Sequence, residues 1–334
     1  MKQVVACMDV WAPAVQEVVR HTAPPELELR FAPSYNPTEQ LALTADADIL
    51  VPGFAAVTAD MLRQSPRVRM IHKWGIGIDS IDLDAVRRHG IALAITTGAN
   101  AGPVAELAIA LMLAVYRRIP YVNRAMRQGR WPTPEMRQTC YQITGKTIGL
   151  VGFGSIGQML ARRLSGFDAQ IIYFDTVRAD VETERALRAR FAPLAEVFST
   201  SDILSLHAPL LAQTARMINA ASIETMKNGA VLINTSRGGL VDEQALYDAI
   251  MRGKLHGAGL DAFDPEPPAV DNPLLALDQV VVTPHAGGGV FDNVANVASH
   301  AFGNIMNFLR GEPIRAADLM IAGAPVTAVR VRHG

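Results

Sequence analysis

Cysteine is scarce in this sequence. Of the 334 residues, only Cys7 and Cys140 are cysteines, and they lie far apart in the chain. Two isolated thiols make neither a disulfide framework nor a cysteine-based metal site. The scarcity is typical of a protein in a reducing compartment and argues against a small secreted domain stabilised by disulfides.

A targeting signal and a long apolar run are also missing. The first residues, MKQVVACMDV, carry one lysine and a short apolar run that Asp9 interrupts, which is not the pattern of a signal peptide. The apolar run Leu107–Val115 is too short to cross a bilayer, and Arg117 follows it closely. We therefore expect a cytoplasmic protein that does not enter a membrane.

Neither sign of charge is in excess, and aromatic residues are few. The formal net charge is −1, and aromatic residues make up 6% of the chain. No basic patch or basic-aromatic stripe is visible, so we expect no nucleic-acid or membrane partner. Histidines and carboxylates show no ligand spacing such as H-x₃-H, so we expect no metal site either.

Short β-rich runs alternate along the chain with longer amphipathic stretches. This alternation predicts an α/β fold with parallel sheets, and a chain of 334 residues is long enough for two domains. Asp82 is expected to cap a helix that Gly90 ends. In the first hundred residues the predicted strands are Val4–Met8, Asp48–Val51, Val68–His72 and Ile91–Thr96.

A second α/β series begins after a long apolar helix, Val104–Tyr116, and a tryptophan-bearing loop around Gly129–Pro134. A final helical stretch, about Val290–Leu309, follows a sheet that is already complete. We therefore predict a discontinuous first domain (1–100 plus 290–334), a second domain (101–289) and an active cleft between them. The predicted strands of the second series are Thr147–Val151, Ile171–Phe174, Ile203–Leu206, Ala230–Asn234, Gly257–Asp261 and Val280–Thr283, with helices such as Ile156–Leu164 and Glu243–Arg252 between them.

A glycine-rich turn follows the first strand of the second series. Gly152, Gly154 and Gly157 form G-x-G-x-x-G, with an apolar strand before the turn and an amphipathic segment after it. The first glycine permits the tight turn, the second lets the backbone approach a diphosphate, and the third packs helix on strand. The start of the helix adds free N–H groups, so the predicted dinucleotide site is Gly152, Gly154, Ser155, Ile156 and Gly157.

Asp175 stands at the end of the next predicted strand, 18 residues after Gly157. A carboxylate there binds the hydroxyls of a ribose and repels a 2′-phosphate, which favours NAD over NADP. Arg178 keeps binding of NADP possible, because a nearby arginine can accommodate the 2′-phosphate.

Five segments occur in a characteristic order, and together they resemble the D-isomer-specific 2-hydroxyacid dehydrogenase family. The resemblance implies two Rossmann-like domains, a flavodoxin-like substrate domain and an NAD-binding domain. It also implies hydride transfer between NAD(H) and a small D-2-hydroxy or 2-keto acid. The segments are WGIGIDSIDLDA (Trp74–Ala85), NAGPVAELAIAL (Asn100–Leu111), GKTIGLVGFGSIG (Gly145–Gly157), INTSRGGLVDEQAL (Ile233–Leu246) and GAGLDAFDPEP through TPHAGGG (Gly257–Pro267 and Thr283–Gly289).

By this resemblance the catalytic residues are Arg237, Glu266 and His285, with Asp264 as a nearer acidic rival to Glu266. The chemistry asks for the same residue types. A guanidinium fork holds a carboxylate and polarises the neighbouring ketone. A histidine donates or accepts the proton near neutral pH, and a carboxylate beside it orients the ring and favours its charged form.

The resemblance also places further residues around the ligands. His207 and Pro209 line the cofactor cleft, although a structural role for His207 is equally open. The backbone of Gly75, Ile76 and Gly77 binds the substrate carboxylate, together with Arg237 and His285. The remaining residues expected at the cofactor are Thr235, Ser236, Arg237, Asp261, His285 and Gly287.

Two residues depart from the commoner family pattern, which has small residues before the Gly75 loop. Lys73 either binds a second anionic group of the substrate or is an exposed lysine at a strand end. Trp74 either narrows the substrate pocket or packs beneath it.

Two other functions share this fold. One is an NAD-sensing interaction module like the related C-terminal-binding-protein corepressors, although the chain has no long low-complexity flanks. The other is formate dehydrogenase, which resembles the same fold but pairs its histidine with a glutamine where this chain has Glu266. Relatives are usually homodimers, so we expect a homodimer. The sequence determines neither the natural acid nor the favoured direction.

Overall fold

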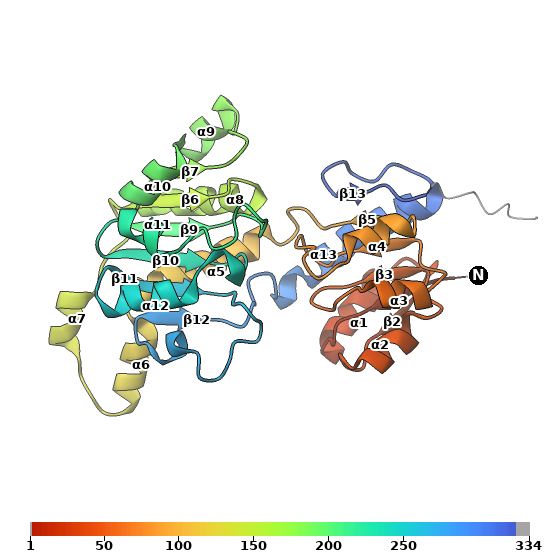
Figure 1. Cartoon of the computed structure of the whole chain (residues 1–334), viewed down its shortest axis with the longest axis horizontal. Helices are drawn as coiled ribbons and strands as arrows, with labels where there is room; N and C mark the ends of the chain where they lie inside the picture. The colour runs from red at the N-terminus through yellow and green to blue at the C-terminus, as the bar shows by residue number, and fades with distance from the viewer. Residues whose placement is uncertain (1, 325–334) are drawn as a thin grey trace, which may run out of the picture. The chain divides into compact units, whose positions relative to one another are not determined.

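The computed structural model describes residues 2–324, which form two compact units (Figure 1). Unit 1 comprises two separate stretches of the described chain, 2–100 and 289–324, whereas unit 2 is the single stretch Ala101–Gly288. Each unit contains one sheet with a hydrophobic cluster on each face.

The sheet of unit 1 has six strands in the order β13-β5-β4-β3-β1-β2. Val4 and Ala6 of β1 belong to the cluster on one face, and Val5 and Cys7 belong to the other. Strands that bury both faces are typical of parallel sheets covered by helices. The strands are β1 (Gln3–Cys7), β2 (Leu27–Phe31), β3 (Ile49–Val51), β4 (Met70–His72), β5 (Ala92–Ala94) and β13 (Leu319–Ile321).

Helices of unit 1 supply the apolar side chains that cover these faces. The long helix α13 buries Phe302 and Ile305 against the cluster that contains Val5. Asp82 caps α4 as predicted, because its side chain accepts a hydrogen bond of 2.8 Å from the N–H of Ala85. The helices are α1 (Pro13–Thr22), α2 (Pro37–Thr44), α3 (Ala59–Gln64), α4 (Leu83–Arg88) and α13 (Val294–Arg310), preceded by the 3₁₀ turn η4 (Phe291–Asn293).

Unit 2 has a seven-stranded sheet in the order β12-β11-β10-β9-β6-β7-β8, and all its pairs are parallel. From β6 the chain builds β7 and β8 on one side, then crosses to β9 on the other. The switch point of this sheet therefore lies between β6 and β9. The strands are β6 (Thr147–Val151), β7 (Gln170–Phe174), β8 (Ala189–Phe191), β9 (Ile203–Leu206), β10 (Ala230–Asn234), β11 (Leu255–Leu260) and β12 (Val280–Val282).

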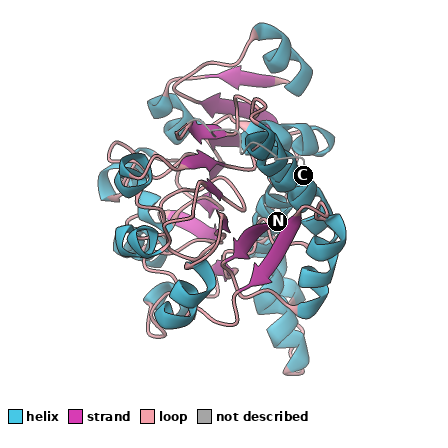
Figure 2. Ribbon diagram, turned by 90° about the vertical axis from the view of Figure 1, so that its right-hand side faces the viewer, coloured by secondary structure: helices cyan, strands magenta, loops and turns pink. Residues whose placement is uncertain are grey.

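Helices cover both faces of this second sheet, and Figure 2 shows helices flanking the strands on both sides. Leu111 and Met112 of α5 are buried in the cluster on one face, and Leu246 of α12 in the cluster on the other. The helices are α5 (Ala101–Tyr116), α6 (Ile119–Arg127), α7 (Thr133–Thr139), α8 (Ser155–Leu164), α9 (Val181–Leu187), α10 (Leu194–Thr200), α11 (Ala220–Thr225) and α12 (Glu243–Met251), with 3₁₀ turns η1 (Ser165–Phe167), η2 (Gly238–Leu240) and η3 (Pro273–Ala276).

The predicted α/β class is confirmed, and three details differ from the expectation. β13 pairs antiparallel with β5, so the sheet of unit 1 is not purely parallel. The stretch expected to be a loop around Gly129–Pro134 is partly helical, because Thr133 and Pro134 begin α7. Asp261 follows β11 rather than ending it. Within residues 2–324, no helix combines the length and apolarity needed to cross a bilayer.

Candidate active site

The glycine-rich turn connects β6 to α8 at the switch point of unit 2. Gly152 has φ +99°, and a Cβ there would overlap the carbonyl of His207, which follows β9. A Cβ on Gly157 would overlap the carbonyl of Gly152, whereas a Cβ on Gly154 would meet no atom within 4 Å. The first and third glycines thus permit close packing inside the protein, and the second faces open space at the start of α8.

Asp175 follows β7 and holds the same turn. Its Oδ2 accepts a hydrogen bond of 2.6 Å from the N–H of Phe153, and its Oδ1 accepts one of 3.2 Å from Val177. Arg178 lies nearby, but two hydrogen bonds of 2.8 Å join its guanidinium to Glu184. Arg178, the residue that kept binding of NADP possible, is therefore already hydrogen-bonded to a carboxylate of its own unit.

Two polar atoms near this turn are buried without a hydrogen-bond partner among the described residues. They are Nδ1 of His207 and Oγ1 of Thr235. Nε2 of His207 lies 2.9 Å from the hydroxyl of Ser205, and burial lowers the pKa of His207 to about 4, so the ring is neutral near pH 7. Pro209, in the same loop, is exposed. Buried polar atoms without a partner at a switch point fit a site built for a polar ligand such as a dinucleotide.

The turn after β10 presents Arg237. Asn234 organises this turn, because its amide accepts from the N–H of Ser236 (3.0 Å) and donates to the carbonyl of Arg237 (2.8 Å). The hydroxyl of Ser236 donates to the carbonyl of Leu206 at the end of β9 (2.6 Å). A Cβ on Gly238 would overlap the backbone of Phe263, so only glycine allows this turn to approach the loop after β11 so closely.

Glu266 and His285 form a hydrogen-bonded pair. Nδ1 of His285 lies 2.8 Å from Oε2 and 3.0 Å from Oε1 of Glu266, and Glu266 also accepts from the N–H of Phe263. Burial raises the pKa of Glu266, but the hydrogen bond and charge of His285, with a smaller effect of Arg237, bring it below its ordinary value. The rival acid, Asp264, is exposed, and its N–H donates to Glu243.

Asp261 fixes the loop that carries His285. Its Oδ1 accepts from the hydroxyl of Thr283 (2.6 Å) and the N–H of Ala286 (2.8 Å), and its Oδ2 accepts from Gly287 (2.9 Å). Asp261 is 1% exposed, so the carboxylate faces its own loop. This arrangement gives Asp261 a positioning role in its own loop, and the contact of Asp261 and Gly287 with the cofactor stays a prediction. His285 itself has φ +52° in this loop.

The predicted substrate loop lies in unit 1, directly after β4. Gly75 has φ +127°, and its N–H donates to the hydroxyl of Thr96 (2.7 Å). The structure therefore corrects one expectation: the N–H of Gly75 is engaged inside the protein. Among residues 2–324, none accepts a hydrogen bond from the N–H of Ile76 or Gly77, which leaves those two donors for a ligand.

Comparison with known proteins gives the family. Residues 109–287 match the family model described as the NAD-binding domain of D-isomer-specific 2-hydroxyacid dehydrogenases. The chain belongs to the D-isomer-specific 2-hydroxyacid dehydrogenase family. It is accordingly an NAD-dependent oxidoreductase of 2-hydroxy and 2-keto acids.

Curated relatives and solved structures agree with this assignment. The chain is 37% identical over 258 residues to the glyoxylate reductase of Korarchaeum cryptofilum, covering 77% of each chain. It is 40% identical over 252 residues to the hydroxypyruvate reductase of Thermotoga maritima, covering 75% of this chain and 80% of the relative. The holo D-mandelate dehydrogenase of Rhodotorula graminis superposes with a TM-score of 0.85 at 27% identity, covering 97% of this chain and all of that one.

Lys73 of this dehydrogenase differs from one of its two expectations. It is 6% exposed rather than an exposed lysine at a strand end, and its ammonium donates a hydrogen bond to the carbonyl of Gly53. That position does not favour recognition of a second anionic group. Trp74 packs on Trp11, with ring centroids 4.7 Å apart, next to the core cluster of unit 1. This contact favours the second alternative for Trp74, in which the side chain packs beneath the substrate pocket.

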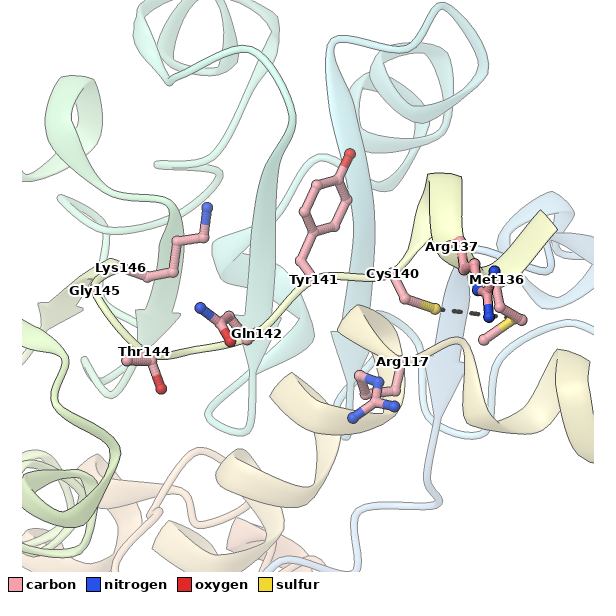
Figure 3. Close-up of a pocket in the computed structure, with 9 residues that line it drawn as sticks. All are labelled: Arg117, Met136, Arg137, Cys140, Tyr141, Gln142, Thr144, Gly145 and Lys146. Carbon is pink, nitrogen blue, oxygen red and sulfur yellow. Dashed lines mark hydrogen bonds between the residues drawn. The ribbon is translucent and has the colours of Figure 1, made fainter. Parts of the chain in front are cut away.

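A separate pocket of about 580 Å³ lies on unit 2 of the dehydrogenase (Figure 3). Arg117, Arg137 and Lys146 line it, together with Cys140, whose thiol lies 3.9 Å from the sulfur of Met136. None of the residues predicted to bind substrate or cofactor lines this pocket. Within the described part of the chain, no group of three or more histidine, cysteine or acidic side chains is arranged to hold a metal ion.

Proposed function

We propose that this dehydrogenase interconverts a 2-keto acid and its D-2-hydroxy acid, with Arg237, Glu266 and His285 as catalytic residues. The observation that carries the proposal is the pair of Glu266 and His285, joined at 2.8 Å through Nδ1. A carboxylate at Nδ1 fixes the ring and leaves Nε2 to exchange a proton with the substrate.

In the reductive direction, the ketone gains one hydride at C2 and one proton at its oxygen. That hydride, with both its electrons, would come from NADH held at the glycine turn and the start of α8, and NAD⁺ would remain. His285 gives the proton to the oxygen and is neutral after the reaction. Glu266 stabilises the charged ring of His285 before the transfer. The lowered pKa of Glu266 supports this role, because its carboxylate stays ionised at neutral pH. In the oxidative direction His285 takes the proton back.

Arg237 holds the substrate by its carboxylate and polarises the ketone. Its guanidinium stands on a turn fixed by Asn234 and Ser236, which limits its freedom before the substrate arrives. We assign the N–H groups of Ile76 and Gly77 to the same carboxylate, and the positive φ of Gly75 shapes that loop.

The cofactor would be held by the switch point of unit 2. The N–H groups at the start of α8, in Ser155, Ile156 and Gly157, suit its diphosphate, and the open face of Gly154 admits it. Asp175 would bind the ribose hydroxyls, which favours NAD over NADP. His207 and Thr235 offer buried polar atoms to the rest of the molecule.

The test is turnover by the purified enzyme, followed as loss of NADH absorbance with a panel of 2-keto acids. We expect His285→Ala and Arg237→Ala each to lower kcat/KM by roughly 10²–10⁴-fold, the usual effect of removing a proton donor or an anchoring charge. The control is NADH binding by fluorescence titration, which shows whether each variant still folds around the cofactor. Turnover that survives either substitution would contradict the assignment.

We further propose that the enzyme is a cytoplasmic homodimer. Exposed apolar side chains gather on α6 and on the two loops that flank α7, where Trp131 is 75% and Ile119 52% exposed. The alternative contact element, α5, is largely buried inside unit 2 and is not available. Light scattering would give twice the monomer mass of 36.0 kDa, and cell fractionation would test the compartment.

A further inference from the structure

The sheet of unit 1 has its own switch point, between β1 and β3. The chain passes from β1 to β2 on one side, then returns to β3 on the other. Ligands of open α/β sheets bind outside the carboxyl ends of the strands at such a point. The loops that follow β1 and β3 are therefore the first place to look for contacts with a substrate.

Asp9, directly after β1, holds these two loops together. Its carboxylate accepts hydrogen bonds from three successive N–H groups: Gly53, Phe54 (2.6 Å) and Ala55 (3.0 Å). Asp9 is 2% exposed, and a Cβ on Gly53 would overlap its carboxylate. The loop after β3 is thus rigid and presents the side chain of Phe54 in a fixed place.

Three apolar side chains of this edge reach solvent. Phe54 is 60% exposed, Ile76 41% and Val10 46%. The loops of Phe54 and Ile76 are neighbours, because the N–H of Trp74 donates to the carbonyl of Pro52 (2.8 Å). An exposed phenylalanine on a rigid loop beside the free N–H groups of Ile76 and Gly77 marks a surface that contacts a ligand.

Positive charge is almost absent from the same edge. The loops at the carboxyl ends of β1 to β5 (8–12, 32–36, 52–58, 73–82 and 95–100) contain no arginine and a single lysine, Lys73, whose ammonium bonds to a carbonyl. The acidic residues of these loops are Asp9 and Asp82, which accept hydrogen bonds from backbone N–H groups, and Asp79, which is exposed. Arg315 reaches the last loop, but Asp318 binds its guanidinium at 2.9 and 3.0 Å. Among the described residues of these loops, a phosphate or second carboxylate would find no cationic side chain that is not already hydrogen-bonded to another group.

We propose that the substrate of this enzyme is a 2-keto acid with an apolar side chain, branched alkyl or aryl, and that Phe54 and Ile76 form the wall against which this side chain packs. The inference rests on the proposed function, since the wall flanks the N–H groups assigned to the carboxylate. It excludes substrates with a second anionic group. It also makes Phe54 the residue that determines which substrate side chains the enzyme prefers.

The experiment compares kcat/KM, with NADH, for two apolar keto acids and three small or anionic ones. Phenylpyruvate and 4-methyl-2-oxopentanoate are the apolar pair, and glyoxylate, hydroxypyruvate and 3-phosphohydroxypyruvate are the others. We expect kcat/KM for the apolar pair to exceed that for the other three by about tenfold or more, the usual discrimination of a hydrophobic pocket.

A pair of variants assigns the preference to the wall. Phe54→Ala should lower the ratio of kcat/KM for phenylpyruvate over glyoxylate by about tenfold, mainly through KM. The matched control is Met320→Ala, which removes another exposed apolar side chain of unit 1 (47% exposed) from the edge strand β13, and it should leave the ratio unchanged. Phe54→Leu, which keeps an apolar side chain, should restore most of the ratio.

The outcomes separate the two proposals. A preference for glyoxylate or 3-phosphohydroxypyruvate, or a ratio that Phe54→Ala leaves unchanged, overturns the inference and leaves the dehydrogenase assignment standing. Absence of turnover with every acid, while NADH still binds, overturns the proposed function itself.

Discussion

The two units share one plan and differ in what their switch points present to solvent. In unit 2 the glycine turn leaves the first N–H groups of α8 without a side-chain cap, and Gly154 faces open space. In unit 1 the corresponding place holds Asp9, whose buried carboxylate binds three successive backbone N–H groups. Free N–H groups attract an anion, whereas bound ones do not. At the switch point of unit 1 a buried carboxylate therefore already binds the N–H groups of the loop after β3, and this loop presents an apolar side chain to solvent.

The largest expected effect concerns two glycines of the same turn. Gly152→Ala forces a side chain into a backbone conformation of φ +99° and against the carbonyl of His207, so we expect unit 2 to lose about 4 kcal/mol of its unfolding free energy. Gly154→Ala should leave stability unchanged and weaken NADH binding, because its Cβ meets only open space. Urea unfolding and NADH fluorescence titration measure the two effects. Equal stability losses in both variants would contradict this account of the turn.

The next effect is a pH dependence located in unit 1. Burial, together with the charge of His300, lowers the pKa of His72 to about 4, although Asp318 acts in the opposite direction. Between pH 6.5 and 4 the unfolded chain therefore binds more protons than the folded one, and the unfolding free energy falls as the pH falls, by about 3 kcal/mol in total.

Tryptophan emission during urea unfolding measures this effect, because Trp11 and Trp74 pack against the core of unit 1, whereas Trp131 of unit 2 is already 75% exposed in the folded protein. His72→Gln, which does not titrate, should flatten the dependence for unit 1 over that range. The contribution of Asp318, whose pKa several hydrogen bonds hold low despite its burial, should be lost only at more acid pH. A slope that His72→Gln leaves intact would assign the titration to another group.

The smallest effect tests the carboxylate that distinguishes unit 1. Asp9→Asn keeps one acceptor oxygen but loses the other, so at least one of the three backbone N–H groups loses its partner. We expect unit 1 to lose about 2 kcal/mol of unfolding free energy. NADH binding, assigned to unit 2, should not change. A variant as stable as the parent would show that water replaces Asp9, and the rigid presentation of Phe54 would have to be abandoned.

Every central strand was predictable from the sequence, whereas of the four edge strands only the apolar β12 (Val280–Val282) was. β6, β9 and β10 have the predicted bounds, because strands buried on both faces are continuous apolar runs. No strand was predicted at β2, β8 or β13, and all three stand at an edge of their sheet. Edge strands are half covered and carry charge, such as Glu28 and Arg30 in β2, so their sequences resemble loops.

The candidate site divides in a similar way. Motifs of consecutive residues identified the glycine turn and the pair of Glu266 and His285, which the structure brings together. The roles of Asp9 and Asn234 were not predicted, because their partners are set by turns and by contacts that no local pattern encodes. One of the two expectations for Lys73, an exposed lysine at a strand end, fails for the same reason, because the hydrogen bond of Lys73 to Gly53 joins loops 20 residues apart.

The division of unit 1 between the two ends of the chain has a consequence for its synthesis. A ribosome completes the first hundred residues long before it makes α13 and β13, which cover one face of that sheet and pair with β5. Unit 2, a single stretch, can fold as soon as it emerges. The nascent chain therefore carries an open apolar sheet past a finished domain, and shielding that sheet until residue 321 emerges is the point at which a chaperone matters most.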